Sequence, residues 1–257
     1  MFIDVHCHLT DDKLKDDLSR IVSEFKAAGV GRVINVGCDA ESSACAFKQA
    51  QEFPEIYFAA GLHPQELKDK DISEIYEIEK LCKAEKCVAV GEIGLDYYWD
   101  KTYCDKQKEF FLAQTELAYS LKLPLNIHVR EAMGDAVKLI RDNKGKFCYG
   151  GVMHCFSGSR ETARELLNLG LYISFGGSVT FKNSKTVKEV AAFVPKDRLL
   201  TETDSPYLAP EPLRGTVNSP ENIPIIAAKL AEIRGKSVED IEIATEENAR
   251  RLFYGLK

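Results

Sequence analysis

The chain opens with Met1-Phe2-Ile3-Asp4-Val5-His6-Cys7-His8, a short apolar run that ends in two histidines. Apolar and β-branched residues in a run of this length favour a buried strand. Because side chains alternate between the faces of a strand, we expect Asp4, His6 and His8 to share one face. Val5 and Cys7 then lie on the other. Two imidazoles on one face can bind the same divalent metal ion, although the pair alone is equally compatible with two half-exposed histidines.

Similar apolar runs recur along the chain, and each is followed by a segment with helical periodicity. The predicted strands are Phe2–His6, Arg32–Gly37, Ile56–Gly61, Cys87–Gly91, Leu125–His128, Gly151–His154, Tyr172–Phe175 and Leu199–Thr203. The predicted helices are Leu14–Ala28, Ser42–Phe53, Ile72–Ala84, Lys106–Leu121, Glu131–Asp142, Arg160–Leu169, Thr186–Phe193, Glu221–Arg234 and Ser237–Phe253.

Eight strands that alternate with helices in 257 residues predict an α/β fold of the (β/α)8, or TIM, barrel type. No Gly/Ser-rich linker divides the chain, so we expect a single barrel domain over residues 1–257. The alternative is a doubly wound open sheet. It is disfavoured because no Gly-x-Gly-x-x-Gly turn follows the first strand.

Composition and charge narrow the classes of function. A net charge of −6 argues against a basic face that coats nucleic acid, but not against an enzyme whose metal ions meet phosphates. Eight cysteines without a Cys-x-x-Cys pair predict reduced thiols. The chain has no leader-like start and no uncharged apolar stretch of membrane-spanning length. We therefore expect a cytoplasmic protein, with a monomer favoured.

All five histidines stand at the carboxyl ends of predicted strands. They are His6, His8, His63, His128 and His154. In a (β/α)8 barrel these ends form one rim, and active sites of such barrels lie there. This placement favours a metal site over scattered structural histidines. For His63 we expect a substrate contact, with a turn residue before Pro64 as the alternative.

Carboxylates join the same predicted rim. Glu92 follows Val88 and Val90 at a period of two, so we expect all three side chains to point into the barrel. A carboxylate in that position is costly unless it is paired or bound to a metal. Asp204 follows the eighth strand and is expected to act at the rim. Asp4 lies deeper and is expected to accept a hydrogen bond from a ligand histidine.

The predicted ligands are four histidines, Glu92 and Asp204. These six side chains are more than the three protein ligands of one catalytic zinc ion, and they suit a site for two ions. The first ion is expected on His6, His8, Glu92 and Asp204, and the second on Glu92, His128 and His154. Glu92 would bridge the two ions. Asp204 would orient a water molecule and accept its proton, which makes Glu92 and Asp204 the expected catalytic residues. Glu202, deeper in its strand, is expected to be structural.

The motifs around these residues resemble the TatD family of metal-dependent deoxyribonucleases. They are Phe2–Leu9, Gly61–Pro64, Val90–Tyr97, His128–Arg130, His154–Gly158, Glu202–Leu208 and Asn248–Phe253, and they run in order from the first residues to the last. The resemblance implies an amidohydrolase-superfamily barrel with two divalent ions, Mg²⁺ in function with Zn²⁺ or Mn²⁺ as alternatives. It further implies 3′→5′ exonuclease activity on single-stranded DNA ends, and on RNA in some members.

One motif departs from the family pattern. Where the family often has Arg-Gly-Lys-Arg-Asn-x-Pro, this chain has Arg214-Gly215-Thr216-Val217-Asn218-Ser219-Pro220. The loss of two adjacent cations predicts a lower affinity for a nucleic-acid backbone. Arg130 and Arg214 remain as the expected phosphate-binding residues, while Lys182 is more typical of a solvated surface.

Three aromatic residues, Tyr97, Tyr98 and Trp99, follow Glu92 closely in the sequence. They either stack on a nucleotide base at the rim or pack beneath their own loop. The sequence does not decide between these two roles.

Other functions use the same chemistry. Similar barrels could hydrolyse small esters or amides, or the ester bond of aminoacyl-tRNA. A metal-binding scaffold with little turnover belongs to a different class. The rim carboxylate Asp204 and the arginines Arg130 and Arg214 argue against it.

Overall fold

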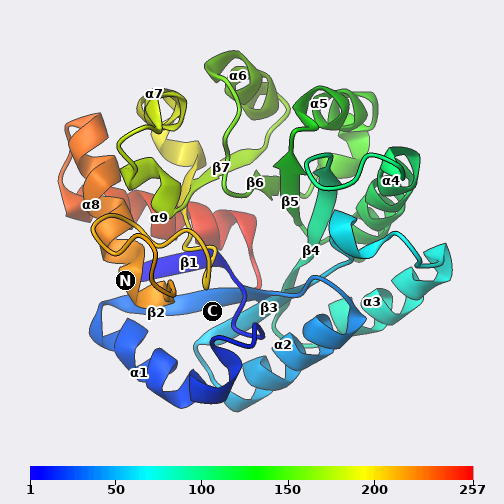
Figure 1. Ribbon diagram of the computed structural model, residues 1–257, viewed down its shortest axis with the longest axis horizontal. Coiled ribbons are helices and arrows are strands. Elements are labelled where there is room, and N and C mark those ends of the chain that lie inside the picture. The colour runs from blue at the N-terminus through cyan, green and yellow to red at the C-terminus, as the bar shows by residue number, and fades with distance from the viewer. Residues whose placement is uncertain (257) are drawn as a thin grey trace.

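The structure, a computed structural model, describes residues 1–256. In this range eight parallel strands form one sheet in the order β1 to β8, and each strand pairs with the next. The two edges meet, because the backbone N–H of Asp204 donates to the carbonyl of His6 over 2.9 Å. Figure 1 shows the nearly closed barrel with helices around it, which confirms the predicted (β/α)8 fold.

The strands are β1 (Phe2–Cys7), β2 (Val30–Val36), β3 (Ile56–Ala60), β4 (Cys87–Asp96), β5 (Leu125–Arg130), β6 (Gly151–Met153), β7 (Tyr172–Phe175) and β8 (Leu199–Thr201). The helices are α1 (Leu18–Ala27), α2 (Ala40–Glu52), α3 (Ile75–Cys82), α4 (Cys104–Leu121), α5 (Met133–Asp142), α6 (Arg160–Asn168), α7 (Lys185–Phe193), α8 (Ile223–Arg234) and α9 (Val238–Leu252).

Strand β4 differs most from its predicted bounds, since it ends at Asp96 rather than Gly91. It continues because it keeps pairing with β5, with Gly94 opposite His128 and Asp96 opposite Arg130. Gly94 permits this approach: its φ is 148°, and a Cβ there would lie 1.8 Å from the carbonyl oxygen of His128. Glu92 therefore lies inside a strand, where its backbone is held on both sides.

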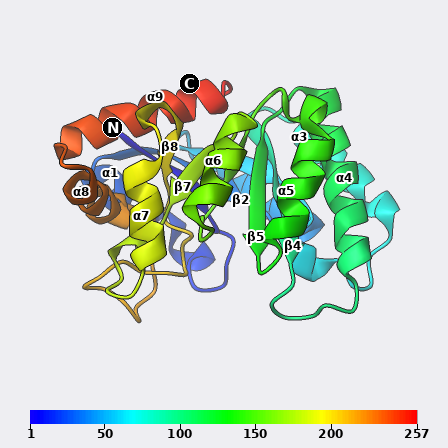
Figure 2. The ribbon, with the colours of Figure 1, turned by 90° about the horizontal axis from the view of Figure 1, so that it is seen from above.

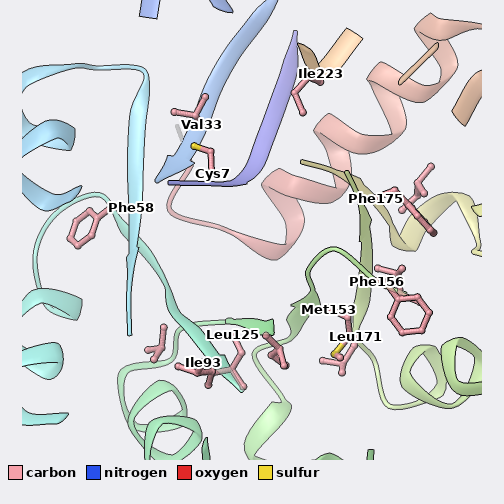
Figure 3. Packing of buried hydrophobic residues seen from close by; sticks show 14 of the residues in the cluster. Cys7, Val33, Phe58, Ile93, Leu125, Met153, Phe156, Leu171, Phe175 and Ile223 are labelled. Atoms are coloured by element: carbon pink, nitrogen blue, oxygen red, sulfur yellow. The ribbon is translucent and has the colours of Figure 1, made fainter. Parts of the chain in front are cut away.

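Apolar side chains on the two faces of the sheet form two clusters. The outer cluster fills the space between the strands and the surrounding helices, and Figure 3 shows members such as Phe58, Leu125 and Phe175. The inner cluster comes from alternate positions of the same strands. It includes Ile3, Val5, Ile34, Val36, Tyr57, Val88, Val152, Tyr172 and Leu200.

Register shifts interrupt the simple alternation at several points of the sheet, and the shifts in β4 and β1 bear on the site. Between Val90 and Ile93, three residue steps of β4 face two of β5, so Val90 and Ile93 both belong to the outer cluster. The expectation that Val90 points inward with Glu92 is therefore wrong. A similar shift in β1 places Val5 in the inner cluster and Cys7 in the outer one, so these two residues do not share a face.

One end of the barrel is closed by α9. Its residues Ala249 and Leu252, with Phe253 and Leu256 beyond its end, complete the inner cluster. In Figure 2 this helix crosses the upper edge, whereas the loops after β1, β4 and β8 project from the lower edge. The polar groups of the strand ends therefore lie at the end opposite α9.

Within residues 1–256 no helix is long and apolar enough to cross a membrane. The eight cysteines, all inside this range, are free thiols.

Candidate metal centre

The strand ends opposite α9 bring the six predicted ligands together, and His63 with them. Among the described residues, groups with ligand atoms close enough to hold a metal ion include His6, His8 and Glu92, and also His63, Glu92 and His128. These side chains come from the ends of β1, β3 and β5 and, for Glu92, from inside β4. All of them are buried except His128, which is half-buried.

The first cluster joins the ends of β1 and β8 to β4. The Nε2 atoms of His6 and His8 lie 3.1 Å apart, and each is 3.5 Å from Oε2 of Glu92. Oδ1 of Asp204 lies 3.7 Å from His6 Nε2 and 3.5 Å from His8 Nε2. Ligands placed tetrahedrally about 2.1 Å from a metal ion are about 3.4 Å from one another. The spacing of these four atoms fits a cation at their centre.

The second cluster surrounds the other oxygen of Glu92. Oε1 lies 2.9 Å from Nδ1 of His128 and 3.0 Å from Nε2 of His154. The two imidazole nitrogens are 3.2 Å apart. The rings of His154 and His6 stack at 3.8 Å and connect the two clusters. Glu92 thus presents one oxygen to each group.

Partners behind each ring fix which nitrogen faces the centre. In the first cluster, Nδ1 of His6 donates to Oδ1 of Asn126 and Nδ1 of His8 donates to the carbonyl of Val36, both over 2.9 Å. The amide of Asn126 is itself oriented, because Nδ2 donates to the carbonyl of Val5. A neutral imidazole that donates through one nitrogen presents a lone pair on the other.

In the second cluster too, a hydrogen-bond partner behind each ring fixes which nitrogen faces the centre. Nε2 of His128 donates to Oδ2 of Asp96 over 3.2 Å, and Nδ1 of His154 donates to Oε1 of Glu202 over 3.3 Å. The free nitrogens then point lone pairs at carboxylate oxygens, which repel them. A divalent cation between these donors removes the repulsion, so the residues present fit a metal ion.

His63 has the opposite orientation. The backbone N–H of Gln65 donates to its Nδ1 over 3.2 Å, so the proton of the neutral ring sits on Nε2. That nitrogen lies 3.5 Å from Oε1 of Glu92. Burial lowers the pKa of His63 to about 3, which keeps the ring neutral. His63 therefore offers an N–H donor rather than a lone pair at the edge of the second cluster.

The clusters are electrostatically matched to a cation. Burial alone would raise the pKa of Glu92, but His63, His154 and the other imidazoles hold it well below its usual value. Burial alone would lower the pKa of His154, yet the carboxylates of Glu92 and Glu202 raise it well above the ordinary value. The raised pKa favours the protonated ring of His154 when no ion is present, so metal binding there releases a proton.

Asp204 reaches the first cluster from a left-handed backbone conformation, with φ of 56°. Burial would raise the pKa of Asp204, but its hydrogen bond with His8 and the nearby charge of His154 lower it. The carboxylate is therefore ionised and able to accept a proton.

Two deeper carboxylates have roles that the sequence did not reveal fully. Oδ1 of Asp4 accepts from the backbone N–H groups of His6 and Thr203, at 3.2 and 3.0 Å. The prediction that Asp4 accepts a hydrogen bond from a histidine ring is therefore wrong, because Asn126 takes that role. Glu202 is fully buried and accepts from the backbone N–H of Cys155 over 2.6 Å as well as from His154. It orients a cluster histidine.

The predicted phosphate-binding residues lie outside the clusters. Arg130 ends β5, two residues after His128, and is exposed. Arg214 lies in the loop after β8 with its guanidinium 4.5 Å from the centre of the Phe181 ring. Asn218 of the same loop is buried and donates to the carbonyls of Thr203 and Tyr207, both over 2.8 Å, so it fixes the loop beside Asp204.

A (β/α)8 barrel with paired imidazole–carboxylate clusters at the carboxyl ends of its strands defines the class of metal-dependent hydrolases. Comparison with known families then specifies the family. The model described as TatD related DNase matches residues 3–254, and the chain belongs to this family. The resemblance seen in the sequence is confirmed.

Similar proteins agree with this assignment. The chain is 43% identical over 253 residues to YabD of Bacillus subtilis (strain 168), described as an uncharacterized metal-dependent hydrolase, with 98% of this chain and 99% of YabD covered. It is 37% identical over 255 residues to YcfH of Escherichia coli (strain K12), which has the same description, with 98% and 95% covered. The crystal structure of YjjV, a TatD homolog from Escherichia coli K12, superimposes with a TM-score of 0.94 at 30% identity, covering 98% of each chain.

Proposed function

We propose that this protein hydrolyses phosphodiester bonds at the 3′ ends of single-stranded DNA, and of RNA where the pocket accepts it, with two divalent ions. The observation that carries the proposal is the placement of Glu92, whose two oxygens face separate imidazole clusters at distances of 2.9 to 3.5 Å. Membership of a family named for deoxyribonucleases supports the substrate class.

His6, His8, Glu92 and Asp204 would hold one ion, and Glu92, His128 and His154 the other. Two divalent ions in these positions would polarise a phosphoryl oxygen and lower the pKa of the attacking water. Mg²⁺ is the proposed physiological ion, while the imidazole-rich donor set also suits Zn²⁺ or Mn²⁺.

The remaining steps belong to side chains of this chain. Asp204, ionised and at the rim, accepts the proton of the attacking water at its other carboxylate oxygen, Oδ2. His63 donates its Nε2 proton in a hydrogen bond to a phosphoryl oxygen and so stabilises the negative charge that develops there. Because its ring stays neutral, this donor is present throughout the physiological pH range.

Arg130 and Arg214 are the proposed phosphate contacts on the two sides of the centre. In the loop after β8, the exposed Thr216 and Val217 stand where the family often has cations. We therefore propose that the protein binds a strand end with few backbone contacts, which gives a weak dependence of affinity on salt.

The test uses metal-stripped protein and a single-stranded DNA oligomer with a free 3′ end, to which Mg²⁺, Mn²⁺ or Zn²⁺ is added separately. The expected result is a metal-dependent ladder that shortens from the 3′ end and disappears with a chelator. A strand with a blocked 3′ end serves as the control, and equal degradation of both strands would overturn the exonuclease assignment.

The variant Asp204→Ala separates catalysis from scaffolding. We expect hydrolysis to fall by about 10²–10⁴-fold, as for loss of a general base, while the ion between Glu92, His128 and His154 stays bound. If the native protein binds two ions per chain but cleaves no oligomer with any of them, the proposal fails. The carboxyl esters of aminoacyl-tRNA and small molecules are then the substrates to test.

A further inference from the structure

Two exposed aromatic side chains lie in the loop after β4, the strand that carries Glu92. Tyr98 and Trp99, the second and third residues after β4, are 47% and 66% exposed. Tyr97 differs from them: it packs against the outer cluster, and its hydroxyl donates to Asp135 over 2.9 Å. Of the two roles left open by the sequence, packing beneath the loop describes Tyr97 but not Tyr98 or Trp99.

Arg130 joins the two exposed rings. The carbon at the centre of its guanidinium lies 3.7 Å from the centre of the Tyr98 ring and 5.4 Å from that of Trp99. The two rings meet edge to face, 4.8 Å apart at 88°. The guanidinium covers one face of Tyr98 and holds it in place, while the largest apolar side chain of the chain stays in solvent. Two exposed aromatic rings held together by a guanidinium offer a surface on which a planar group can stack.

The position of this cluster relates it to the reacting groups. Arg130 lies opposite Asp96 in the ladder of β4 and β5, and the carboxylate of Asp96 accepts from His128. Arg130 stands two positions after His128 in strand β5, a distance of about 7 Å along the strand. Figure 2 shows the loop after β4 at the edge of the barrel from which the loops after β1 and β8 also project.

We propose that Tyr98, Trp99 and Arg130 form a stacking site for the base of the nucleotide next to the phosphodiester that is cut. The aromatic rings offer an apolar platform to any base, and the guanidinium supplies the positive charge for the adjoining phosphate. This inference rests on the proposed function. It adds that recognition depends on a base beside the scissile bond, because the loop after β8 offers Thr216 and Val217, and no further cation, beyond Arg214.

Fluorescence provides a test that needs no catalysis, since Trp99 is the single tryptophan of the chain. Metal-free protein is titrated with the dinucleotide d(TpT) and, separately, with a dinucleotide of equal charge that lacks both bases. We expect saturable quenching of Trp99 by d(TpT) and none by the abasic compound at the same concentration. Equal quenching by both, or quenching by neither, would overturn the stacking site.

Kinetics test the same idea on the holoenzyme. With an oligomer that carries its bases, Trp99→Ala should raise KM by about tenfold or more, the usual effect of losing one stacking contact, with little change in kcat. Two further oligomers each lack the base at one of the last two 3′ positions. With at least one of these oligomers the native enzyme should show the same raised KM. Trp99→Ala should not raise the KM for that oligomer any further. Trp99→Phe should restore most of the affinity.

Tyr254→Ala is the matched control, because Tyr254 is 58% exposed and follows α9 at the closed end of the barrel. Its KM should equal that of the native enzyme on every oligomer. Cleavage that ignores missing bases would overturn the stacking site and leave the proposed function standing. Failure to cleave any oligomer would overturn the proposed function, while the fluorescence titration would still report on the platform.

Discussion

The two ends of the barrel are built from the same strands and differ in chemistry. Toward α9, inward positions such as Ile3, Val88 and Leu200 form an apolar cluster that excludes water. At the other end, inward side chains of the same strands are imidazoles and carboxylates, including Glu92. The apolar end stabilises the fold, and the polar end can then hold costly buried charges in fixed positions. We expect substitutions at the two ends to separate stability from catalysis.

The largest effect should come from Glu92→Gln. An amide keeps the size of the side chain but removes the charge that both clusters share, so we expect loss of bound metal and a fall in kcat of about 10³-fold or more. Elemental analysis and hydrolysis rates check this together. Glu239→Gln, on the exposed surface of α9, is the control and should change neither. Two ions per chain and full activity in Glu92→Gln would remove its bridging role.

The closed end should give the opposite result. Phe253 is fully buried in the inner cluster, and Phe253→Ala should lower the free energy of unfolding by about 3–5 kcal/mol. Below its unfolding transition the variant should keep its metal content and kcat. Denaturant unfolding and the same hydrolysis assay measure both quantities. A large loss of kcat in the folded variant would show that the two ends are not independent.

Within the open end, His63 and His128 provide a sharper contrast, because both face Oε1 of Glu92 but with different tautomers. His128→Gln should lose the ion of the second cluster. His63→Gln should keep both ions and lower kcat by about 10²-fold, as expected for one donor to a developing negative charge. Loss of an ion from His63→Gln, measured by elemental analysis, would make His63 a ligand instead.

The last prediction concerns pH. Burial raises the pKa of Asp4 to about 8, although its hydrogen bonds with Thr203 and His6 oppose this shift. Between its unfolded value near 4 and about 8, the folded state therefore binds more protons than the unfolded state. The contribution of Asp4 to stability is complete below about pH 4 and is lost as pH rises to about 8.

Asp4→Asn should flatten this part of the curve in metal-free protein. Unfolding free energies of both proteins, measured by denaturant titration from pH 5 to 8.5, give the comparison. Parallel curves would show that Asp4 is ionised in the folded state.

Much of the site could be predicted because strand ends are visible in the sequence. Each histidine follows an apolar run, and parallel strands bring their carboxyl ends to one rim, so His6 and His154 could be placed together without coordinates. The rule that side chains alternate between the two faces of a strand gave wrong predictions where an extra residue enters a strand. No residue type marks the bulge between Val90 and Ile93, and only the pairing of β4 with β5 shows it.

Hydrogen-bond partners that come from distant strands could not be predicted from the sequence either. Asn126 orients His6 across 120 residues, and an asparagine inside an apolar strand gave only a weak signal. For His63, the sequence is compatible with two roles, a turn before Pro64 and a substrate contact. The turn is what fixes the tautomer, through the N–H of Gln65, and so both roles follow from one local geometry.

The sharing of Glu92 has a thermodynamic consequence. In the proposed two-ion site one carboxylate would serve both ions, and their binding equilibria would be interdependent, because occupancy of one cluster orients the carboxylate and changes the protonation of the other. Linkage requires that this influence be equal in both directions, whatever its sign. With two ions bound as proposed, the titration curve for metal uptake would not be the sum of two independent isotherms, and it would shift with pH because metal uptake releases protons.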